Sequence, residues 1–176
     1  MPASTPFLSF PLDPPVHDLS RFDSGEPDLD TWLRDRAVTA ARARVAQTFV
    51  WVRDADAPRV VLYYALSAHA IPRAEAPSRI GRGVPDPVPG ALLAKLALDR
   101  PRHGSGLGQV LLIDALQRIL QASEQGPAVR AIVVDAATDA GRALYAKFGF
   151  VAAPGRPDRM LVRAETVARG LKPNTS

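Results

Sequence analysis

Three glycines at alternate positions, Gly104, Gly106 and Gly108, lie between a strand-like and a helix-like segment. Glycine lets the backbone approach a ligand closely and turn its N–H groups toward it. The first N–H groups of the following helix have no partner within the helix, and the helix dipole makes that end positive. Residues 103–108 can therefore bind a phosphate or pyrophosphate through the backbone. The pattern also fits an ordinary glycine-rich turn before a helix.

Two common phosphate-binding patterns do not match this loop. It does not end in the Lys-Ser or Lys-Thr pair of a nucleotide-binding P-loop. Gln109 stands where the Rossmann fingerprint has its third glycine. If the loop binds a phosphate, neither pattern identifies the ligand.

The elements around the loop follow from the periodicity of the sequence. Ala91–Leu98 is apolar apart from Lys95 and predicts a central strand, and Gly106–Ala122 predicts a helix. The segment Asp99–Ser105 is then the loop between them. Further along the chain we expect, in order, a strand at Val129–Val134, a helix at Asp139–Lys147, and a last strand pair at Phe150–Ala153 and Arg159–Arg163.

The first half of the chain predicts a helix and a hairpin. Apolar residues at helical spacing indicate an amphipathic helix over Asp28–Val45, with Pro27 at its entry. Thr48–Val52 and Arg59–His69 read as two strands joined by a turn. The proline- and glycine-rich segment 73–90 cannot continue a helix or a long strand and is expected to be a loop.

This order of elements predicts an α/β (α+β) fold with a single mixed, mostly antiparallel sheet and helices on both faces. A chain of 176 residues, 47% of them hydrophobic, fits one domain over 1–176. We expect an irregular lead-in over 1–15, with a short strand at Phe7–Phe10, and a C-terminal tail over about 164–176.

Composition excludes several classes of site. The absence of cysteine removes disulfides, thiolate metal sites and cysteine nucleophiles. The three histidines, His17, His69 and His103, are far apart, and we expect no metal. No stretch reaches the ~20 apolar residues of a membrane span, and no signal peptide is apparent at the N-terminus. We therefore expect a soluble, cytoplasmic protein that does not contact a membrane.

The net charge of +4 comes from 19 arginines and 3 lysines. Basic residues cluster between Arg34 and Arg53 and again after Arg142. Such clusters suit a polyanionic partner, and they equally suit a solvated charged face.

Two motifs resemble the signatures of the GNAT acetyltransferases. The run His103-Gly104-Ser105-Gly106-Leu107-Gly108 is similar to their Gln/Arg-x-x-Gly-x-Gly/Ala loop, with histidine at the first position. The run Arg142–Phe150, with Tyr145 and a Phe-Gly-Phe turn, resembles their second signature. The resemblance implies a GNAT fold and acetyl-CoA as co-substrate, with its pyrophosphate on the loop amides.

A narrower resemblance covers roughly Phe7–Phe150. The segments that carry it are His17–Gly25, Leu29–Arg34, Val61–Ser67, Pro85–Pro89 and Lys95–Asp99. They look like the acetyltransferase toxins of bacterial type II toxin–antitoxin modules. That resemblance implies acetylation of the α-amine of aminoacyl-tRNA, which blocks translation, and it implies a homodimer and a ribbon-helix-helix antitoxin.

The resemblance also implies roles for individual residues. The backbone of Leu96, Ala97 and Leu98, with the loop His103–Gly108, would hold acetyl-CoA, and the Leu98 amide is a candidate donor to the thioester oxygen. Tyr145 is the candidate general acid for the CoA thiolate; the alternative is a packed tyrosine with its hydroxyl at an edge. Asp99, Glu75 and His69 are possible but unconvincing bases. An aminoacyl α-amine with a pKa near ~7.7 has little need of one.

Arginines suit phosphate contacts. The candidates for tRNA binding are Arg34, Arg42, Arg44, Arg73, Arg79, Arg82 and Arg142. Two other functions remain open. One is a GNAT enzyme acting on a small amine or a protein N-terminus, and the other is a non-catalytic CoA-binding corepressor or interaction partner.

Overall fold

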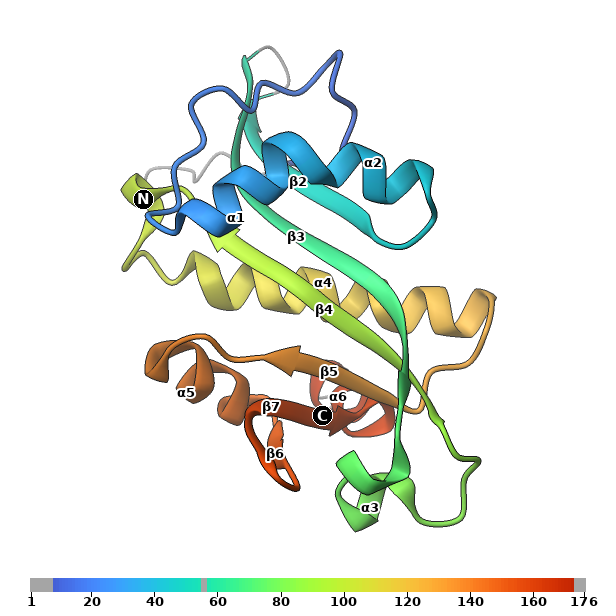
Figure 1. The fold of residues 1–176 in the computed structure, drawn as a ribbon. Coiled ribbons are helices and arrows are strands. Elements are labelled where there is room, and N and C mark those ends of the chain that lie inside the picture. The colour runs from blue at the N-terminus through green and yellow to red at the C-terminus, as the bar shows by residue number, and fades with distance from the viewer. Residues whose placement is uncertain (1–7, 55–56, 173–176) are drawn as a thin grey trace. The chain divides into compact units, whose positions relative to one another are not determined.

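The computed structural model describes residues 8–54 and 57–172. By its contacts the chain divides into two compact units. The first comprises Lys95–Leu112 and the described part of Met1–Ser67, and the second comprises Ala68–Ala94 and the described part of Ile113–Ser176. Seven strands form one sheet in the order β1-β2-β3-β4-β5-β7-β6 (Figure 1).

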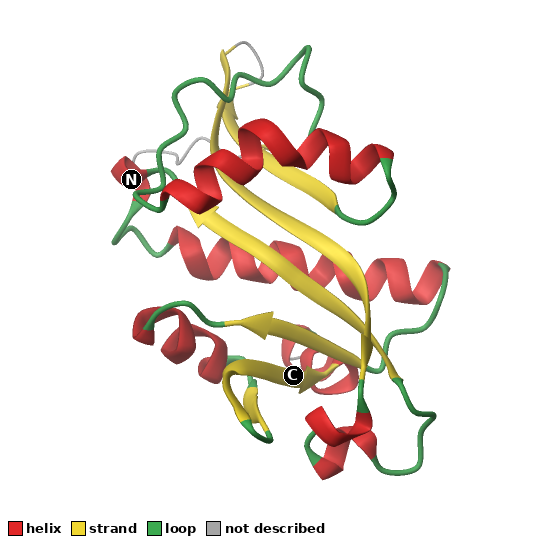
Figure 2. Ribbon diagram, viewed as in Figure 1, coloured by secondary structure: helices red, strands yellow, loops and turns green. Residues whose placement is uncertain are grey.

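One continuous helical run opens the chain after β1 (Leu8–Pro11). It consists of α1 (Pro27–Thr31), a π-helical turn η1 (Trp32–Arg36) and α2 (Ala37–Arg42), and it is drawn as a single coil in Figure 2. The helix predicted over Asp28–Val45 is confirmed, with Pro27 in its first turn. The π-helical turn in its middle was not predicted, because apolar spacing does not distinguish it from α-helix.

The remaining elements follow in chain order. They are β2 (Gln47–Asp54), β3 (Ala57–Ile71), η2 (Arg73–Glu75), α3 (Ser78–Gly81), β4 (Val88–Leu98), η3 (Arg100–Arg102), α4 (Leu107–Gln125), β5 (Ala131–Asp135), α5 (Asp139–Lys147), β6 (Val151–Ala153), β7 (Arg156–Arg163) and α6 (Ala164–Leu171). The proline-rich segment 73–90 holds two short helical turns, and its last residues, Val88–Gly90, already belong to β4, where the prediction of a loop is wrong.

The pairing confirms a mixed, mostly antiparallel sheet. β1 pairs with β2, β2 with β3, and β7 with both β5 and β6, all antiparallel. The β4–β5 pair is parallel, in a register from Gly90–Ala131 to Leu93–Val134. The predicted hairpin of β2 and β3 and the last strand pair are therefore confirmed.

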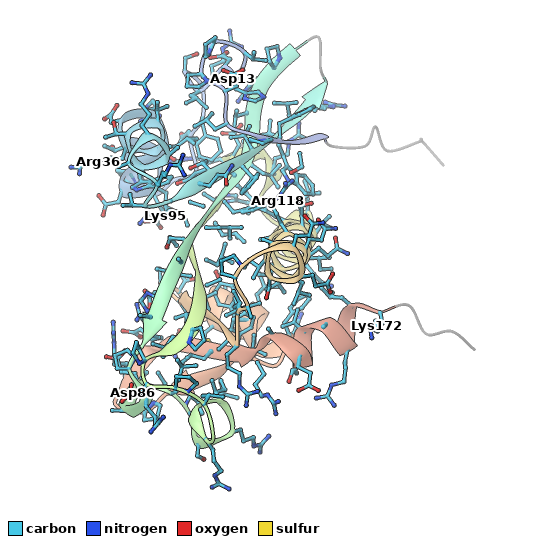
Figure 3. The ribbon with its side chains drawn as sticks, turned by 90° about the vertical axis from the view of Figure 1, so that its right-hand side faces the viewer. Asp13, Arg36, Asp86, Lys95, Arg118 and Lys172 are labelled. Atoms are coloured by element: carbon cyan, nitrogen blue, oxygen red, sulfur yellow. The ribbon has the colours of Figure 1, made fainter. Side chains whose placement is uncertain are left out.

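Each unit has its own apolar cluster. In the first, Phe22 and Leu33 pack with strand residues such as Val50 and Tyr63. This cluster fixes α1–α2 on one face of the strands, while the start of α4 lies on the other face (Figures 1 and 3). In the second unit, Ile71 and Val133 belong to a cluster that also contains Leu161.

Most predicted boundaries differ from the structure by a few residues, including those of the first strand, of β4 and of the C-terminal segment. The N-terminal strand runs over Leu8–Pro11 rather than Phe7–Phe10, and Phe7 lies outside the described residues. β4 begins at Val88, before the predicted Ala91. Pro89 is tolerated there because the register with β5 starts only at Gly90, so its missing N–H removes no bond to β5. The expected tail over 164–176 is helical from Ala164 to Leu171, and 173–176 lie outside the described residues.

Candidate acetyl-CoA site and catalytic tyrosine

A buried carboxylate fixes the point where β4 ends and the glycine loop begins. Asp99 is 2% exposed, and its N–H donates to the Val61 carbonyl at 2.8 Å. One carboxylate oxygen accepts from Arg59 at 2.7 Å, and the other accepts from the Asp23 N–H at 2.9 Å. Both oxygens have a partner within the protein and the side chain is buried, so Asp99 positions the loop and is poorly placed to meet a substrate amine.

The segment around Asp23 clamps the next residue of the loop. The Arg100 N–H donates to the Asp23 carbonyl at 2.8 Å, and Arg100 Nε lies 3.1 Å from Asp23 Oδ2. The hydrogen bond from the Gly25 N–H makes the largest contribution to lowering the pKa of Asp23, and the bond from the Arg100 side chain makes the second largest. The start of the loop is thus held to residues far away in the sequence.

The glycine loop folds back on the end of β4. His103 Nε2 lies 2.8 Å from the Leu98 carbonyl, so this nitrogen must carry the proton when the bond forms. The Ser105 hydroxyl donates to the Arg102 carbonyl. Gly104 and Gly106 have φ of 72° and 78°, values that other residues rarely adopt. Residues 103–106 are exposed, which leaves their backbone accessible to a ligand.

Helix α4 begins directly after this loop. Its 19 residues start at Leu107, and its first turn carries no acidic side chain. Its first N–H groups and positive dipole end are therefore not neutralised by a carboxylate of that turn. A Cβ on Gly108 would lie 3.9 Å from the Leu98 side chain, so helix and strand meet at this glycine. The structure brings together Leu98, His103 and Gly108 in an arrangement that suits a phosphate.

The three strand positions predicted to hold acetyl-CoA lie at the end of β4. Leu96 and Leu98 are partly buried and Ala97 is buried. They follow Leu93, the last β4 residue in register with β5.

Tyr145 lies in the second unit, in the last turn of α5. Thr138 caps this helix by accepting from the Gly141 N–H at 3.0 Å. At the other end the Phe150 N–H donates to the Tyr145 carbonyl, and the Gly149 N–H donates to the Ala146 carbonyl. This pair of bonds is a Schellman motif, and Gly149 supplies the left-handed residue with φ of 88°. The Phe-Gly-Phe turn of the sequence is thus a helix cap.

The Tyr145 ring is held by the same cap. Its centroid lies 5.6 Å from that of Phe150, and the residue is 9% exposed. Burial raises the pKa of the Tyr145 phenol, which keeps it protonated. Among the described residues the hydroxyl has no hydrogen-bond partner. A protonated phenol with a free hydroxyl is chemically suited to give a proton to a leaving group.

The other two candidate bases, His69 and Glu75, belong to an ion cluster in the second unit. Arg159 binds both oxygens of Asp135, at 2.8 and 2.9 Å, and lies 3.1 Å from His69 Nε2. Glu75 lies 3.3 Å from Arg156 and 3.8 Å from Arg159. Since arginine only donates, Nε2 of His69 is the acceptor. Sequence reasoning missed this cluster, whose members come from four separate segments.

The candidate tRNA-binding arginines differ in their contacts. Arg34 donates to the Phe22 carbonyl at 3.1 Å, Arg73 to the Val84 carbonyl, and Arg142 pairs with Asp158 at 2.9 Å. These three have structural contacts. The other four candidates are exposed and have no side-chain interaction among the described residues. They are Arg42, Arg44, Arg79 and Arg82.

Two kinds of feature are absent from the described part of the chain. No group of three or more His, Asp or Glu side chains there could hold a metal ion. No helix there is long and apolar enough to cross a membrane.

Comparison with known proteins gives clear relatives, although no family model matches. A tRNA-acetylating toxin of Mycobacterium tuberculosis (strain ATCC 25618 / H37Rv) is 43% identical over 82% of this chain and 85% of its own. A probable toxin TacT of Sinorhizobium fredii (strain NBRC 101917 / NGR234) is 32% identical over 89% and 91%.

Among solved structures, AtaT complexed with acetyl-methionyl-tRNAfMet has a TM-score of 0.84 at 23% identity, over 95% of this chain and 100% of its own. A structure of AtaTR bound with AcCoA has a TM-score of 0.80 at 22% identity, over 94% of this chain and 98% of its own. A mutant AtaT toxin bound to the C-terminus of the antitoxin AtaR has a TM-score of 0.79 at 21% identity, over 95% and 99%.

Proposed function

The chain belongs to the family of GNAT-type tRNA-acetylating toxins, and on this premise we propose that it transfers the acetyl group of acetyl-CoA to the α-amine of an aminoacyl-tRNA. The observation that carries the proposal is the 43% identity over 82% of the chain to a tRNA-acetylating toxin. Acetylation of that amine would remove the nucleophile that forms the peptide bond, and translation would stop.

Acetyl-CoA supplies the activated acetyl group, and the first unit supplies its binding site. The backbone N–H groups of residues 103–108 would hold the pyrophosphate, together with the positive end of α4. The backbone at Leu96–Leu98 would hold the pantetheine arm as an added strand. The Leu98 N–H would donate to the thioester oxygen as negative charge develops there.

Tyr145 acts as the general acid. When the amine attacks the thioester carbon, the C–S bond breaks and the thiolate takes the phenol proton. A phenol with a raised pKa stays protonated at cellular pH and has its proton available in every cycle. This role requires the sulfur to come within hydrogen-bonding distance of the Tyr145 hydroxyl.

The amine needs no strong base. An α-amine with a pKa near ~7.7 is neutral in a good fraction of molecules at cellular pH. Asp99, Glu75 and His69 are each engaged with an arginine. After the neutral amine attacks, its nitrogen must lose one proton to become an amide. Water therefore accepts that proton as the tetrahedral intermediate collapses.

The tRNA binds through exposed arginines. Arg79 and Arg82, on the turn α3 of the proline-rich segment, offer uncommitted guanidinium groups to phosphates, as do Arg42 and Arg44. Arg34, Arg73 and Arg142 contribute through the donors that their structural contacts leave unused.

The protein works in the cytoplasm, where charged tRNA is found, as one catalytic domain and as a homodimer. It is neutralised by an antitoxin of the ribbon-helix-helix class.

A transfer assay tests the function directly. Purified protein is incubated with labelled acetyl-CoA and total charged tRNA, with deacylated tRNA and spermidine as parallel acceptors. Label on charged tRNA alone, lost with Tyr145→Phe, is the expected result. Label on spermidine would move the activity to small amines. Binding of acetyl-CoA without any transfer would leave a non-catalytic role.

A further inference from the structure

The strand that ends at the acetyl-CoA site carries an unusual cation. Lys95 is one of only 3 lysines in a chain with 19 arginines. Its ammonium lies over the ring of Trp32, 5.9 Å from the centroid. Trp32 stacks in turn on Tyr63, with centroids 6.1 Å apart and planes 5° from parallel. Among the described residues, Lys95 has no carboxylate partner.

This stack is rigid at its base. Tyr63 is fully buried, and its hydroxyl donates to the Leu29 carbonyl at 2.7 Å. That carbonyl lies just before the π-helical turn that begins at Trp32, where the regular ladder of helical hydrogen bonds is interrupted. The aromatic platform therefore presents the Lys95 ammonium at a defined place.

The side chains of β4 divide between its two faces. Ala97 packs with Phe22 and Leu33 on the α1–α2 side. Lys95, two residues earlier, points to the same side, and Figure 3 shows it below the helix that carries Arg36. Leu98 points the other way, toward Gly108 and the start of α4. Lys95 thus lies on the face opposite the glycine loop, away from the expected pyrophosphate.

The absence of a carboxylate partner at Lys95 among the described residues favours an anionic ligand. The helical run above it carries three arginines (Arg34, Arg36, Arg42) and three aspartates (Asp28, Asp30, Asp35), so its charges balance and the positive field comes from Lys95 itself. A half-buried ammonium that no carboxylate neutralises can pair with an anion that a ligand brings. Given the function proposed above, the anion that arrives next to the acetyl group is the phosphodiester at the 3′ end of the tRNA.

We propose that Lys95, presented by Trp32, binds the terminal phosphodiester of the aminoacyl-tRNA and so positions the α-amine at the end of β4. Lys95 is then a positioning residue for the acceptor and has no part in holding acetyl-CoA. The inference rests on the proposed function, because it assumes that charged tRNA is the acceptor.

The test compares Lys95→Met, which keeps the apolar stem, with Lys95→Arg and with the matched control Lys172→Met on the exposed end of the chain. Acceptors are charged tRNA and a 3′-aminoacyl-adenosine, which carries the same amine without the phosphodiester. We expect Lys95→Met to lower kcat/KM on charged tRNA by about tenfold. It should also reduce the salt slope by about 0.7, as loss of one single-strand phosphate contact requires.

On the aminoacyl-adenosine, Lys95→Met should match the wild type. Lys95→Arg should retain most activity on tRNA, and Lys172→Met should lose none. An equal loss on both acceptors, a weaker affinity for acetyl-CoA, or an unchanged salt slope would overturn the inference. Wild-type protein that fails to acetylate any charged tRNA would instead refute the proposed function.

Discussion

Phe150 holds Tyr145 in two ways, because its N–H donates to the Tyr145 carbonyl at 3.3 Å and its ring lies 5.6 Å from the Tyr145 ring. The residue proposed to carry the proton is therefore fixed by the cap of its own helix. The conformation of this cap depends on the glycine between the two aromatic residues.

Tyr145→Phe should remove the acid and keep the ring. We expect kcat on charged tRNA to fall by at least about a hundredfold, the usual scale of general acid catalysis. Acetyl-CoA affinity and melting temperature should change little, since the hydroxyl has no hydrogen-bond partner among the described residues. Isothermal titration and single-turnover kinetics separate these effects. Retained kcat would exclude Tyr145 as the acid.

Gly149→Ala should weaken the cap. A left-handed residue with a Cβ costs about 1–2 kcal/mol, and φ at Gly149 is 88°. Gly155→Ala is the matched control, since φ there is 72° and an added Cβ would meet no atom within 4 Å. Both variants should lower the melting temperature, but only Gly149→Ala should also lower kcat. Equal kcat in the two would show that the cap does not control Tyr145.

Gly106→Ala should weaken acetyl-CoA binding. The φ of 78° at Gly106 sets the direction in which the loop N–H groups point. A Cβ added at this position would meet no protein atom within 4 Å. The substitution therefore disturbs backbone direction without a steric clash, and we expect about a tenfold higher Kd for acetyl-CoA. Gly170→Ala, in open space at an ordinary φ, serves as the control. Calorimetry that gave equal Kd values would argue against the loop as the phosphate site.

Neutralising Arg79 and Arg82 together should weaken the tRNA substrate alone. We expect KM for charged tRNA to rise severalfold and its salt dependence to become shallower, because phosphate contacts are lost. Acetyl-CoA affinity should stay constant. An equal loss of acetyl-CoA binding would contradict a role confined to tRNA.

Acid should destabilise the protein in two steps through the Arg159 cluster. Burial makes the largest contribution to lowering the pKa of His69, and the charge of Arg159 makes the second largest. As pH falls, the His69 imidazole is therefore protonated in the unfolded state before it is protonated in the folded state. Stability begins to fall below about pH 6.5, the ordinary pKa of histidine. The bond from Arg159 lowers the pKa of Asp135, whose contribution is complete above about pH 4 and is lost as pH falls further.

Urea unfolding at about pH 7, 5.5, 4 and 2.5 measures both steps, because the first falls between about pH 7 and 4 and the second below about pH 4. His69→Gln should remove part of the first step and leave the second unchanged. The buried His17, whose pKa burial also lowers, supplies the remainder of the first step. An identical pH profile in His69→Gln would show that His69 has no share in it.

Much of the fold could be predicted from the sequence, because local signals were strong. Helix α5 has the predicted bounds Asp139–Lys147, since a capping threonine precedes it and glycine follows it. Helix α6 was missed although Ala164, Val167 and Leu171 have helical spacing; a C-terminal tail over about 164–176 was expected there instead. The second motif could be read as a pattern, but not as a Schellman cap that orients a ring.

Contacts between distant segments could not be predicted. The bonds of Arg159 join β7 to β3 and β5, and no periodicity links those positions. Asp99 appeared in the sequence as a possible base, whereas its two oxygens hold Arg59 and the Asp23 N–H. A single sequence gives residue types and spacing but not which partners will occupy them.

The Asp23–Asp99 bond joins residues 76 positions apart, which has a consequence for synthesis. Non-local contacts form only after the intervening chain is available and its loop entropy has been lost. Asp23 leaves the ribosome long before Asp99 is added to the chain. The bond that fixes the start of the glycine loop therefore cannot form until Asp99 has also emerged. Tyr145 emerges later still. If Tyr145 is the general acid proposed above, the ribosome that makes this protein has added Tyr145 before any product able to acetylate tRNA exists.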